Sequence, residues 1–227
     1  KRELVQQVYQ QTKVQRVYNL YGPSEDTTYS TFVLVQRNEL SEPTVGRPIS
    51  NTQAYVLDNQ GQPVPIGVMG ELYLGGAGVS RGYLNRPDIS AERYVPNLFS
   101  PTDGGRLYKT GDLVRYLADG RLAFLGRTDR QVKIRGYRIE LGEIEFALAQ
   151  HPSVREVAVV VQGNKLDSKK LVAYIITTDD KGADIGKLRG YLERRLPSYM
   201  IPSLFLCLDA LPLTVNGKTD YRSLLEH

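Results

Sequence analysis

Cysteine, histidine and tryptophan are scarce in this chain of 227 residues, which holds one cysteine, two histidines and no tryptophan. The single Cys207 cannot form an internal disulfide, and its position in the apolar run LFLCLDAL predicts a buried structural thiol. A reducing, cytoplasmic setting fits this cysteine content. Two histidines and one cysteine are too few for a zinc-type ligand cluster. His151 precedes a proline at a predicted helix end and His227 is terminal, so histidine-based acid–base catalysis is not expected.

Long apolar runs and a strong charge of one sign are also missing. No apolar run has the length of a membrane span, and no signal-peptide pattern opens the chain, so no membrane partner is expected. The 29 Lys and Arg against 25 Asp and Glu give a net charge of +4, which is too mild and too scattered to predict nucleic-acid binding. The ending 225–227 resembles the start of a purification tag, and the chain begins at Lys1 without Met. The sequence is therefore expected to be a piece of something longer.

The stretch GRTDRQVKIRGYRIELGE, residues 126–143, divides the chain into two different halves. Before it, frequent glycines and prolines separate short segments, which predicts a small antiparallel barrel or sheet. After it, strand and helix patterns alternate, which predicts a compact α+β unit of roughly a hundred residues. Three cations of the stretch, Lys133, Arg135 and Arg138, have no assigned role and are expected to lie on a solvated strand face.

The spacing of apolar residues and the turn residues predict the individual elements. The predicted helices cover 2–12, 88–93, 141–150 and a segment that Asp184 caps, with Ile185, Leu188, Leu192 and Leu196 inward, before Pro197 ends it. The predicted strands cover 14–18, 28–35, 53–57, 71–74, 107–116, 122–125, 131–135, 157–161, 171–177 and 203–208. Residues 19–26 are predicted to form a loop.

Two short motifs combine residue types that suit a nucleotide. In YGPSE, residues 21–25, an aromatic ring can stack on a base, a hydroxyl can donate to phosphate and a carboxylate can hold Mg²⁺. In YKTGD, residues 108–112, the final carboxylate can accept hydrogen bonds from ribose hydroxyls. Taken alone, each motif is more simply explained as a turn with polar caps.

Two further motifs carry less information by themselves. The run GGAG, residues 75–78, lacks the spacing and the lysine of a phosphate-binding loop, so we interpret it as a structural turn. The turn Asn216-Gly217-Lys218 offers an ammonium that could bridge two anions, although a solvated hairpin lysine is the commoner case.

The order of five stretches is far more specific than any one motif. These are NLYGPSE, GELYLGGAGVSRGYLNRPDISAERY, RLYKTGDLVRYLADG, FLGRTDRQVKIRGYRIELGEIE and LPLTVNGKTD. Together they closely resemble the adenylation domains of non-ribosomal peptide synthetases, which belong to the adenylate-forming superfamily with acyl-CoA synthetases and luciferases. The resemblance runs from about Val14 to Tyr221. It implies that residues 1–128 are the C-terminal portion of a large subdomain, with strands and a small barrel-like region, and that residues 129–224 form a mobile α+β lid.

The resemblance also implies a reaction and a role for individual residues. Such enzymes join a carboxylate to AMP with ATP and Mg²⁺, then pass the acyl group to the phosphopantetheine thiol of a peptidyl carrier protein. The implied roles are ATP binding for Asn19, Tyr21, Gly22, Ser24, Asp112 and Arg127, Mg²⁺ binding for Glu25, adenylation catalysis for Lys218, hinge for Asp129, and lining of the pantetheine tunnel for Gly136.

The substrate is only partly indicated. Leu20, Thr28 and Tyr29 match three side chains of the amino-acid pocket, and their bulk resembles alanine-selecting pockets, with glycine or serine as alternatives. The acidic partner of the substrate ammonium and the phosphate loop of the family lie upstream of the chain, so residues 1–227 alone are not expected to adenylate.

Two other functions stay open from the sequence. One is an acyl- or aryl-CoA ligase of the same superfamily. The other is a degenerate fragment that docks a carrier or a small activator protein, although a docking surface would not need Glu25, Asp112, Arg127 and Lys218 together.

Overall fold

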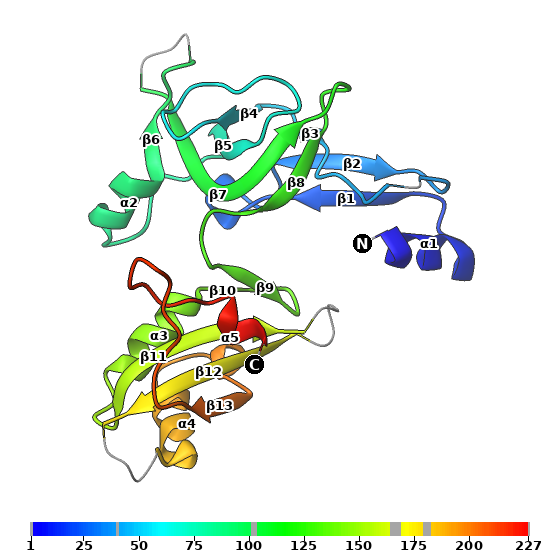
Figure 1. Cartoon of the computed structure of the whole chain (residues 1–227). Coiled ribbons are helices and arrows are strands. Elements are labelled where there is room, and N and C mark those ends of the chain that lie inside the picture. The colour runs from blue at the N-terminus through cyan, green and yellow to red at the C-terminus, as the bar shows by residue number, and fades with distance from the viewer. Residues whose placement is uncertain (1, 40, 101–103, 164–168, 179–182, 227) are drawn as a thin grey trace. The chain divides into compact units, whose positions relative to one another are not determined.

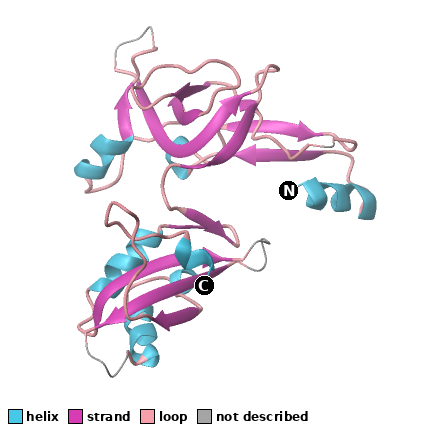
Figure 2. Ribbon diagram, in the orientation of Figure 1, coloured by secondary structure: helices cyan, strands magenta, loops and turns pink. Residues whose placement is uncertain are grey.

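The computed structural model describes residues 2–39, 41–100, 104–163, 169–178 and 183–226 (Figures 1 and 2). The chain forms two compact units, Lys1–Asp129 and Arg130–His227. The boundary drawn from the sequence, between residues 128 and 129, differs from this division by one residue. In the described part of the chain, no helix is long and apolar enough to cross a membrane.

Unit 1 contains two antiparallel sheets. The three-stranded sheet has the order β1 (Val17–Tyr21), β2 (Thr31–Val35) and β3 (Arg47–Pro48), and the helix α1 (Arg2–Gln11) precedes it. The five-stranded sheet has the order β4 (Thr52–Leu57), β5 (Gly70–Gly76), β7 (Arg106–Tyr116) and β6 (Tyr94–Pro96), with β8 (Leu122–Arg127) also paired to β7. The helix α2 (Pro87–Arg93) leads directly into β6. The short antiparallel strands expected from the sequence are therefore present, and β7 is strongly bent (Figure 1).

The core of unit 1 lies under the larger sheet. Its buried members share an apolar character and come largely from alternate positions of the strands, as expected for a sheet with one covered face. They are Val45, Val56, Leu72, Leu74, Val114 and Leu122.

Unit 2 begins with the hairpin of β9 (Val132–Ile134) and β10 (Tyr137–Ile139), followed by the helix α3 (Leu141–Ala149). Its sheet has the order β11 (Val154–Gln162), β12 (Lys170–Thr177) and β13 (Leu204–Cys207), with β13 parallel to β12. The other elements are α4 (Ile185–Glu193), the 3₁₀ turn η3 (Ser198–Met200) and α5 (Ser223–Glu226).

The central strand β12 explains why unit 2 has apolar residues on two faces. Leu171, Ala173 and Ile175 belong to one buried cluster, together with residues of α3 and α4. Val172, Tyr174 and Ile176 alternate with them and belong to a second cluster, which includes Leu224 of α5. Both faces are covered, so the strand is a continuous apolar run, and this is the pattern that allowed its prediction.

Several predicted boundaries in unit 1 were wrong. Residues 19–21 lie in β1 and not in a loop, because they pair with β2 along the register Val17↔Val35 to Tyr21↔Thr31. The second strand begins at Thr31 and not at residue 28, since Thr27 and Thr28 have φ values of 52° and 78°, which a strand does not allow.

Two predictions in unit 2 were also wrong, and one strand was missed. Cys207 is exposed, because it ends the edge strand β13, in which Phe205 is buried in one cluster and Leu206 packs against the other. Ile185 was expected to face inward but is 43% exposed, because it is the first residue of α4. Leu188 and Leu192 are fully buried, and the helix ends at Glu193. The sequence also missed β10, a strand of three residues that is too short to show a period. The predicted Asp184 cap is confirmed, since its Oδ1 accepts from the Lys187 amide at 3.1 Å.

Candidate active site

The carboxylate of Asp112 is the centre of a charged network in unit 1. Asp112 lies in β7, opposite Arg127 of β8 in the strand register, and is 7% exposed. The register places the two side chains together, and Arg127 Nη1 lies 2.5 Å from Asp112 Oδ1. The guanidinium also donates to the Thr110 carbonyl at 3.0 Å. A buried carboxylate next to a planar donor is therefore held in one orientation.

Tyr21, at the end of β1, belongs to the same network. Its hydroxyl donates to Asp112 Oδ2, and its ring packs against the core cluster of unit 1. Burial, with the neighbouring Asp112 charge, raises the pKa of the Tyr21 phenol well above its usual value. The phenol therefore stays protonated and remains a donor to Asp112 at neutral pH.

Asp129 binds the Arg127 guanidinium as a second carboxylate partner. Arg127 Nε donates to Asp129 Oδ1 at 2.7 Å and Nη2 donates to Oδ2 at 2.8 Å, a bidentate pair, and Arg93 lies 3.9 Å from the same carboxylate. Gly111 makes room for this pair. A Cβ there would lie 2.7 Å from Arg127 Nη2 and 2.9 Å from Asp129 Oδ2, and its φ of 76° favours glycine.

Glu25 lies in the 3₁₀ turn η1 (Ser24–Asp26) and is 8% exposed. Its Oε1 accepts from the Tyr83 hydroxyl at 2.6 Å, and its main-chain carbonyl accepts from the Ser80 amide at 2.8 Å. Burial, followed by the hydrogen bond to Glu25, raises the pKa of Tyr83 well above its ordinary value. Tyr83 is therefore a phenol, and a donor, throughout the physiological range.

A divalent ion at Glu25 would have to use few protein ligands. Within the described residues, no group of three or more His, Cys, Asp and Glu side chains could hold a metal. This donor set fits Mg²⁺ bound with a nucleotide, because Mg²⁺ commonly takes one or two carboxylates plus substrate phosphates. It does not fit a metal held by the protein alone.

The remaining nucleotide residues from the sequence lie near these groups along the chain but outside the network. Asn19 Nδ2 donates to the Thr44 carbonyl at 2.7 Å, and Ser24 is exposed at the start of η1. Gly22 has a packing reason of its own, because a Cβ would lie 2.6 Å from the Thr28 carbonyl oxygen. The three residues expected to select the amino acid are all exposed, Leu20 by 46% and Tyr29 by 48%, with Thr28 in a left-handed conformation.

Lys218 lies in unit 2 on an exposed turn. The Thr214 amide donates to the Lys218 carbonyl at 2.7 Å, and the Gly217 amide donates to the Thr214 carbonyl at 2.9 Å. Gly217 has a φ of 75°, which the turn requires. The side chain of Lys218 is exposed and has no hydrogen-bond or ion-pair partner among the described residues.

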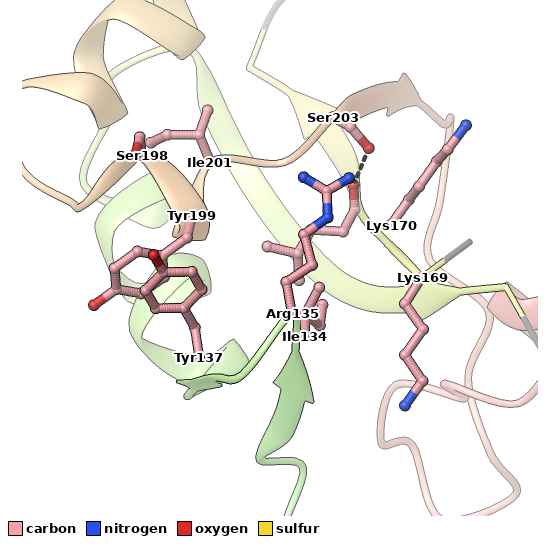
Figure 3. Close-up of a pocket in the computed structure, with 10 residues that line it drawn as sticks. Ile134, Arg135, Tyr137, Lys169, Lys170, Ser198, Tyr199, Ile201 and Ser203 are labelled. Atoms are coloured by element: carbon pink, nitrogen blue, oxygen red, sulfur yellow. Dashed lines mark hydrogen bonds between the residues drawn. The ribbon is translucent and has the colours of Figure 1, made fainter. Parts of the chain in front are cut away.

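Gly136 and Arg135 form the two-residue turn of the β9–β10 hairpin. Their φ values, 86° and 51°, are both positive, as a type I′ hairpin turn requires. A cavity of about 350 Å³ lies beside this turn (Figure 3). The rings of Tyr137 and Tyr199 stack at one side of it, 4.1 Å apart and 7° from parallel. Its charged lining residues are Arg135, Lys169 and Lys170. Gly136 itself is exposed, with nothing within 4 Å of where a Cβ would stand.

Two residues that fix parts of this site, Arg130 and Tyr83, were not identified from the sequence. Arg130 forms a bidentate ion pair with Glu145 of α3, with distances of 2.8 and 2.9 Å, and lies 3.4 Å from the centre of the Tyr221 ring. It therefore fixes the start of unit 2, as Arg127 fixes the end of unit 1. Tyr83 was also missed, although it belongs to the quoted stretch SRGYLNRPDISAERY, whose order was the available signal.

Two family models match the chain on either side of the unit boundary. The model of AMP-binding enzymes matches residues 1–84, and the model of the AMP-binding enzyme C-terminal domain matches residues 143–218. The chain belongs to the family of AMP-binding, adenylate-forming enzymes. This result confirms the resemblance found in the sequence, and the family implies the use of ATP.

Curated relatives place this adenylation-domain sequence among peptide synthetases. A linear gramicidin synthase protein of Brevibacillus parabrevis is 57% identical over 223 residues, which are 98% of this chain and 4% of that protein. A dimodular nonribosomal peptide synthase of Bacillus subtilis (strain 168) is 50% identical over 208 residues, 92% of this chain and 9% of that protein. The chain thus spans less than a tenth of the length of either relative.

A solved structure supports the same family and the expected α+β fold. Holo-PA1221, a non-ribosomal peptide synthetase protein containing adenylation and PCP domains, matches with a TM-score of 0.82 and 31% identity, over 100% of this chain and 38% of that one. The adenylation-domain sequence therefore corresponds to well under half of that solved protein.

Proposed function

We propose that the protein containing this chain activates an amino acid with ATP as aminoacyl-AMP, and then transfers the aminoacyl group to the phosphopantetheine thiol of a carrier protein. The observation that carries the proposal is the Asp112 carboxylate, held between the Tyr21 hydroxyl and the Arg127 guanidinium. Oriented acceptors of this kind suit the two hydroxyls of a ribose. The relatives in peptide synthesis favour this function over a CoA ligase.

The first half-reaction needs charge stabilisation more than proton transfer. The substrate carboxylate attacks the α-phosphorus of ATP, a bond to the α-phosphate forms, and pyrophosphate leaves. Two anions must approach, and negative charge spreads over the non-bridging oxygens. We assign Lys218 to this charge, because its ammonium is exposed on a glycine-containing turn and has no competing partner among the described residues.

Mg²⁺ would be held by Glu25 together with substrate phosphates. The nearly buried carboxylate is a hard oxygen ligand, and the ion would offset phosphate charge when bound. Ser24, Asn19, Gly22 and Tyr21 are assigned to the nucleotide on the strength of the resemblance. The ring of Tyr21 packs against the core but is only half-buried, and we assign its remaining surface to stacking on a base.

In the second half-reaction the carrier thiol attacks the acyl carbon and AMP leaves. We assign Gly136 to the passage for the pantetheine arm, since a residue without a side chain leaves the hairpin turn open. Asp129 is the proposed pivot, because it is the last residue of unit 1 and Arg130 is already fixed in unit 2. Rotation at this position would exchange the Lys218 turn for the Gly136 turn.

Alanine is the proposed amino acid, with glycine or serine as the next choices. Leu20, Thr28 and Tyr29 are exposed, so they are available to line a pocket with residues from outside the chain. A leucine and a tyrosine there would take up volume and favour a small side chain.

The test is ATP–pyrophosphate exchange with a complete adenylation domain that contains residues 1–227, over a panel of amino acids and of fatty and aryl acids. Exchange that depends on a small amino acid supports the proposal, whereas exchange with only fatty or aryl acids would overturn it. Residues 1–227 alone should show no exchange, since the assigned residues include neither a phosphate loop nor an acidic partner for the substrate ammonium. Robust exchange by this shorter chain would refute that part.

A further inference from the structure

The stretch SRGYLNRPDISAERY, residues 80–94, has no role in the proposed reaction although it helped to identify the family. In the structure this stretch contacts η1, which carries Glu25, at two points. Ser80 lies at one end of it and donates its amide to the Glu25 carbonyl at 2.8 Å. Tyr83 lies three residues further on and donates its hydroxyl to Glu25 Oε1 at 2.6 Å. The main chain and the side chain of Glu25 are thus held by separate bonds from one segment.

Tyr83 is itself fixed by its backbone and by its ring. Its amide donates to Ser90 Oγ of α2 at 2.8 Å, and Ser90 Oγ donates to the Arg86 carbonyl at 2.7 Å. Its ring packs edge-on against Tyr94, with centroids 5.7 Å apart. Gly82 allows this approach, since a Cβ there would lie 2.9 Å from Ser90 Oγ.

The segment is also tied to the strand that contains Asp112. Arg106, the first residue of β7, donates to the carbonyls of Arg81 at 2.7 Å and Ser80 at 3.2 Å. The Tyr94 ring lies 5.3 Å from the Tyr108 ring of the same strand. The phenol of Tyr83 is therefore anchored to the larger sheet of unit 1 and not to a free loop.

We infer that Tyr83 is a positioning residue for the Glu25 carboxylate, which it holds in one rotamer for a divalent ion. This inference rests on the proposed function, in which Glu25 binds Mg²⁺. The hydroxyl occupies Oε1, so the carboxylate cannot rotate freely, and Mg²⁺ tolerates little departure from its preferred ligand geometry. The Ser80 amide anchors the main chain of Glu25, whereas the Tyr83 hydroxyl bonds its carboxylate, so the two bonds fix different parts of Glu25. Loss of an outer partner of this kind typically lowers metal affinity by about 10- to 100-fold.

The test compares ATP binding with and without Mg²⁺ by calorimetry, using a complete adenylation domain that contains residues 1–227. In the Tyr83→Phe variant the ring and its contact with Tyr94 remain and only the hydroxyl is lost. The gain in ATP affinity that Mg²⁺ provides should fall about 10-fold or more, while binding of metal-free ATP stays unchanged. In exchange assays, the Mg²⁺ concentration for half-maximal rate should rise and the KM for the amino acid should not.

Tyr55→Phe is the matched control, because it removes a hydroxyl of the same unit that donates to Gln53 Oε1 and has no bond to Glu25 among the described residues. It should leave the Mg²⁺-dependent gain at the wild-type value. Ser90→Ala removes the acceptor of the Tyr83 amide and leaves Glu25 unchanged. It should reduce the Mg²⁺-dependent gain in ATP affinity by less than Tyr83→Phe does. This variant tests the role of Tyr83 if Tyr83→Phe does not fold.

A Tyr83→Phe variant whose Mg²⁺-dependent gain stays within about twofold of wild type would overturn the inference. An equal loss with and without Mg²⁺ would also overturn it, since that result indicates a merely structural role. Glu25→Gln separates the two hypotheses. If it abolishes the gain while Tyr83→Phe does not, only the role of Tyr83 fails; if neither changes it, the assignment of Glu25 in the proposed function fails.

Discussion

The carboxylates of unit 1 and the lysine turn of unit 2 are held in opposite ways. Asp112 and Glu25 are 7% and 8% exposed, and each accepts a hydrogen bond from a half-buried tyrosine. Lys218 is exposed on a turn that is held by main-chain hydrogen bonds and by the Thr214 hydroxyl. The difference suits a nucleotide site that is organised before substrate arrives, and a cation that is delivered afterwards.

The largest effect should come from removing the exposed cation. Lys218→Ala should lower the rate of adenylation by about 10²–10³-fold or more, because it removes charge stabilisation at the phosphate. Transfer from preformed aminoacyl-AMP to the carrier thiol should continue, as measured by single-turnover loading. The free energy of unfolding should change by less than about 0.5 kcal/mol, since the side chain is exposed.

Lys133→Ala is the control for the lysine, since Lys133 is also exposed in unit 2 and has no assigned role. It should leave both half-reactions unchanged. If Lys218→Ala slows both half-reactions equally, the assignment of the lysine to adenylation is wrong.

Removing a fixed carboxylate should affect binding and stability together. Asp112→Ala removes a partner of Arg127 and of Tyr21. We expect it to lower the free energy of unfolding by about 1–3 kcal/mol. ATP affinity should fall at the same time, as measured by calorimetry. Denaturant unfolding of the variant that matches wild type would contradict the view that this half of the site is built in advance.

The pivot can be tested with a pair of variants at Asp129. Both Asp129→Pro and Asp129→Ala remove the bidentate partner of Arg127, but only proline restricts the backbone torsion. Thioester formation should slow about 10-fold or more in the proline variant relative to alanine, while adenylation rates of the two stay close. Equal thioester rates, followed by stopped-flow loading of the carrier, would count against a pivot at this residue.

The smallest effect should be the pH dependence of local stability at Asp220, which follows the turn that carries Lys218. Hydrogen bonds from Ser223, its hydroxyl foremost, and from the Arg222 amide lower the pKa of Asp220 below its usual value. A lowered folded pKa means that this contribution is present above the unfolded pKa, about 3.9, and is lost as pH falls through the lower folded value. The protection factors of the Ser223 and Leu224 amides should therefore fall in strong acid, and they should stay constant from about pH 5 to 8.

Asp220→Asn should remove this acid dependence while leaving Lys218 active at neutral pH. A loss of amide protection between about pH 5 and 8 in the wild-type chain would show that Asp220 is not the group responsible.

Long, strongly patterned segments were predictable from the sequence. The apolar run of β12 and the capped helix α4 were both found, because apolar spacing and a capping aspartate are local signals. Two short strands were not found. The strands β10 and β6 have three residues each, and they exist because a neighbouring strand pairs with them.

The candidate site shows the same division. The order of the motifs along the chain identified Tyr21, Asp112 and Arg127 as site residues. Taken alone, the motifs that contain Tyr21 and Asp112 were more simply explained as turns. Only the register of β7 and β8 brings Asp112 opposite Arg127, and only the packing of β1 adds the Tyr21 hydroxyl. The expected burial of Cys207 failed for the same reason, since an edge position is a property of the sheet and not of the run LFLCLDAL.

The sequence by itself determined the family, the two-part organisation around residues 126–143, and which residue types are available for ATP chemistry, because these depend on the order of residues along the chain. The tertiary structure alone decided which of those groups touch. Tyr83 and Glu25 are 58 positions apart, and Tyr21 and Asp112 are 91 apart. Contacts across such separations depend on strand pairing and on loops that pack against the sheet, and no local pattern records them.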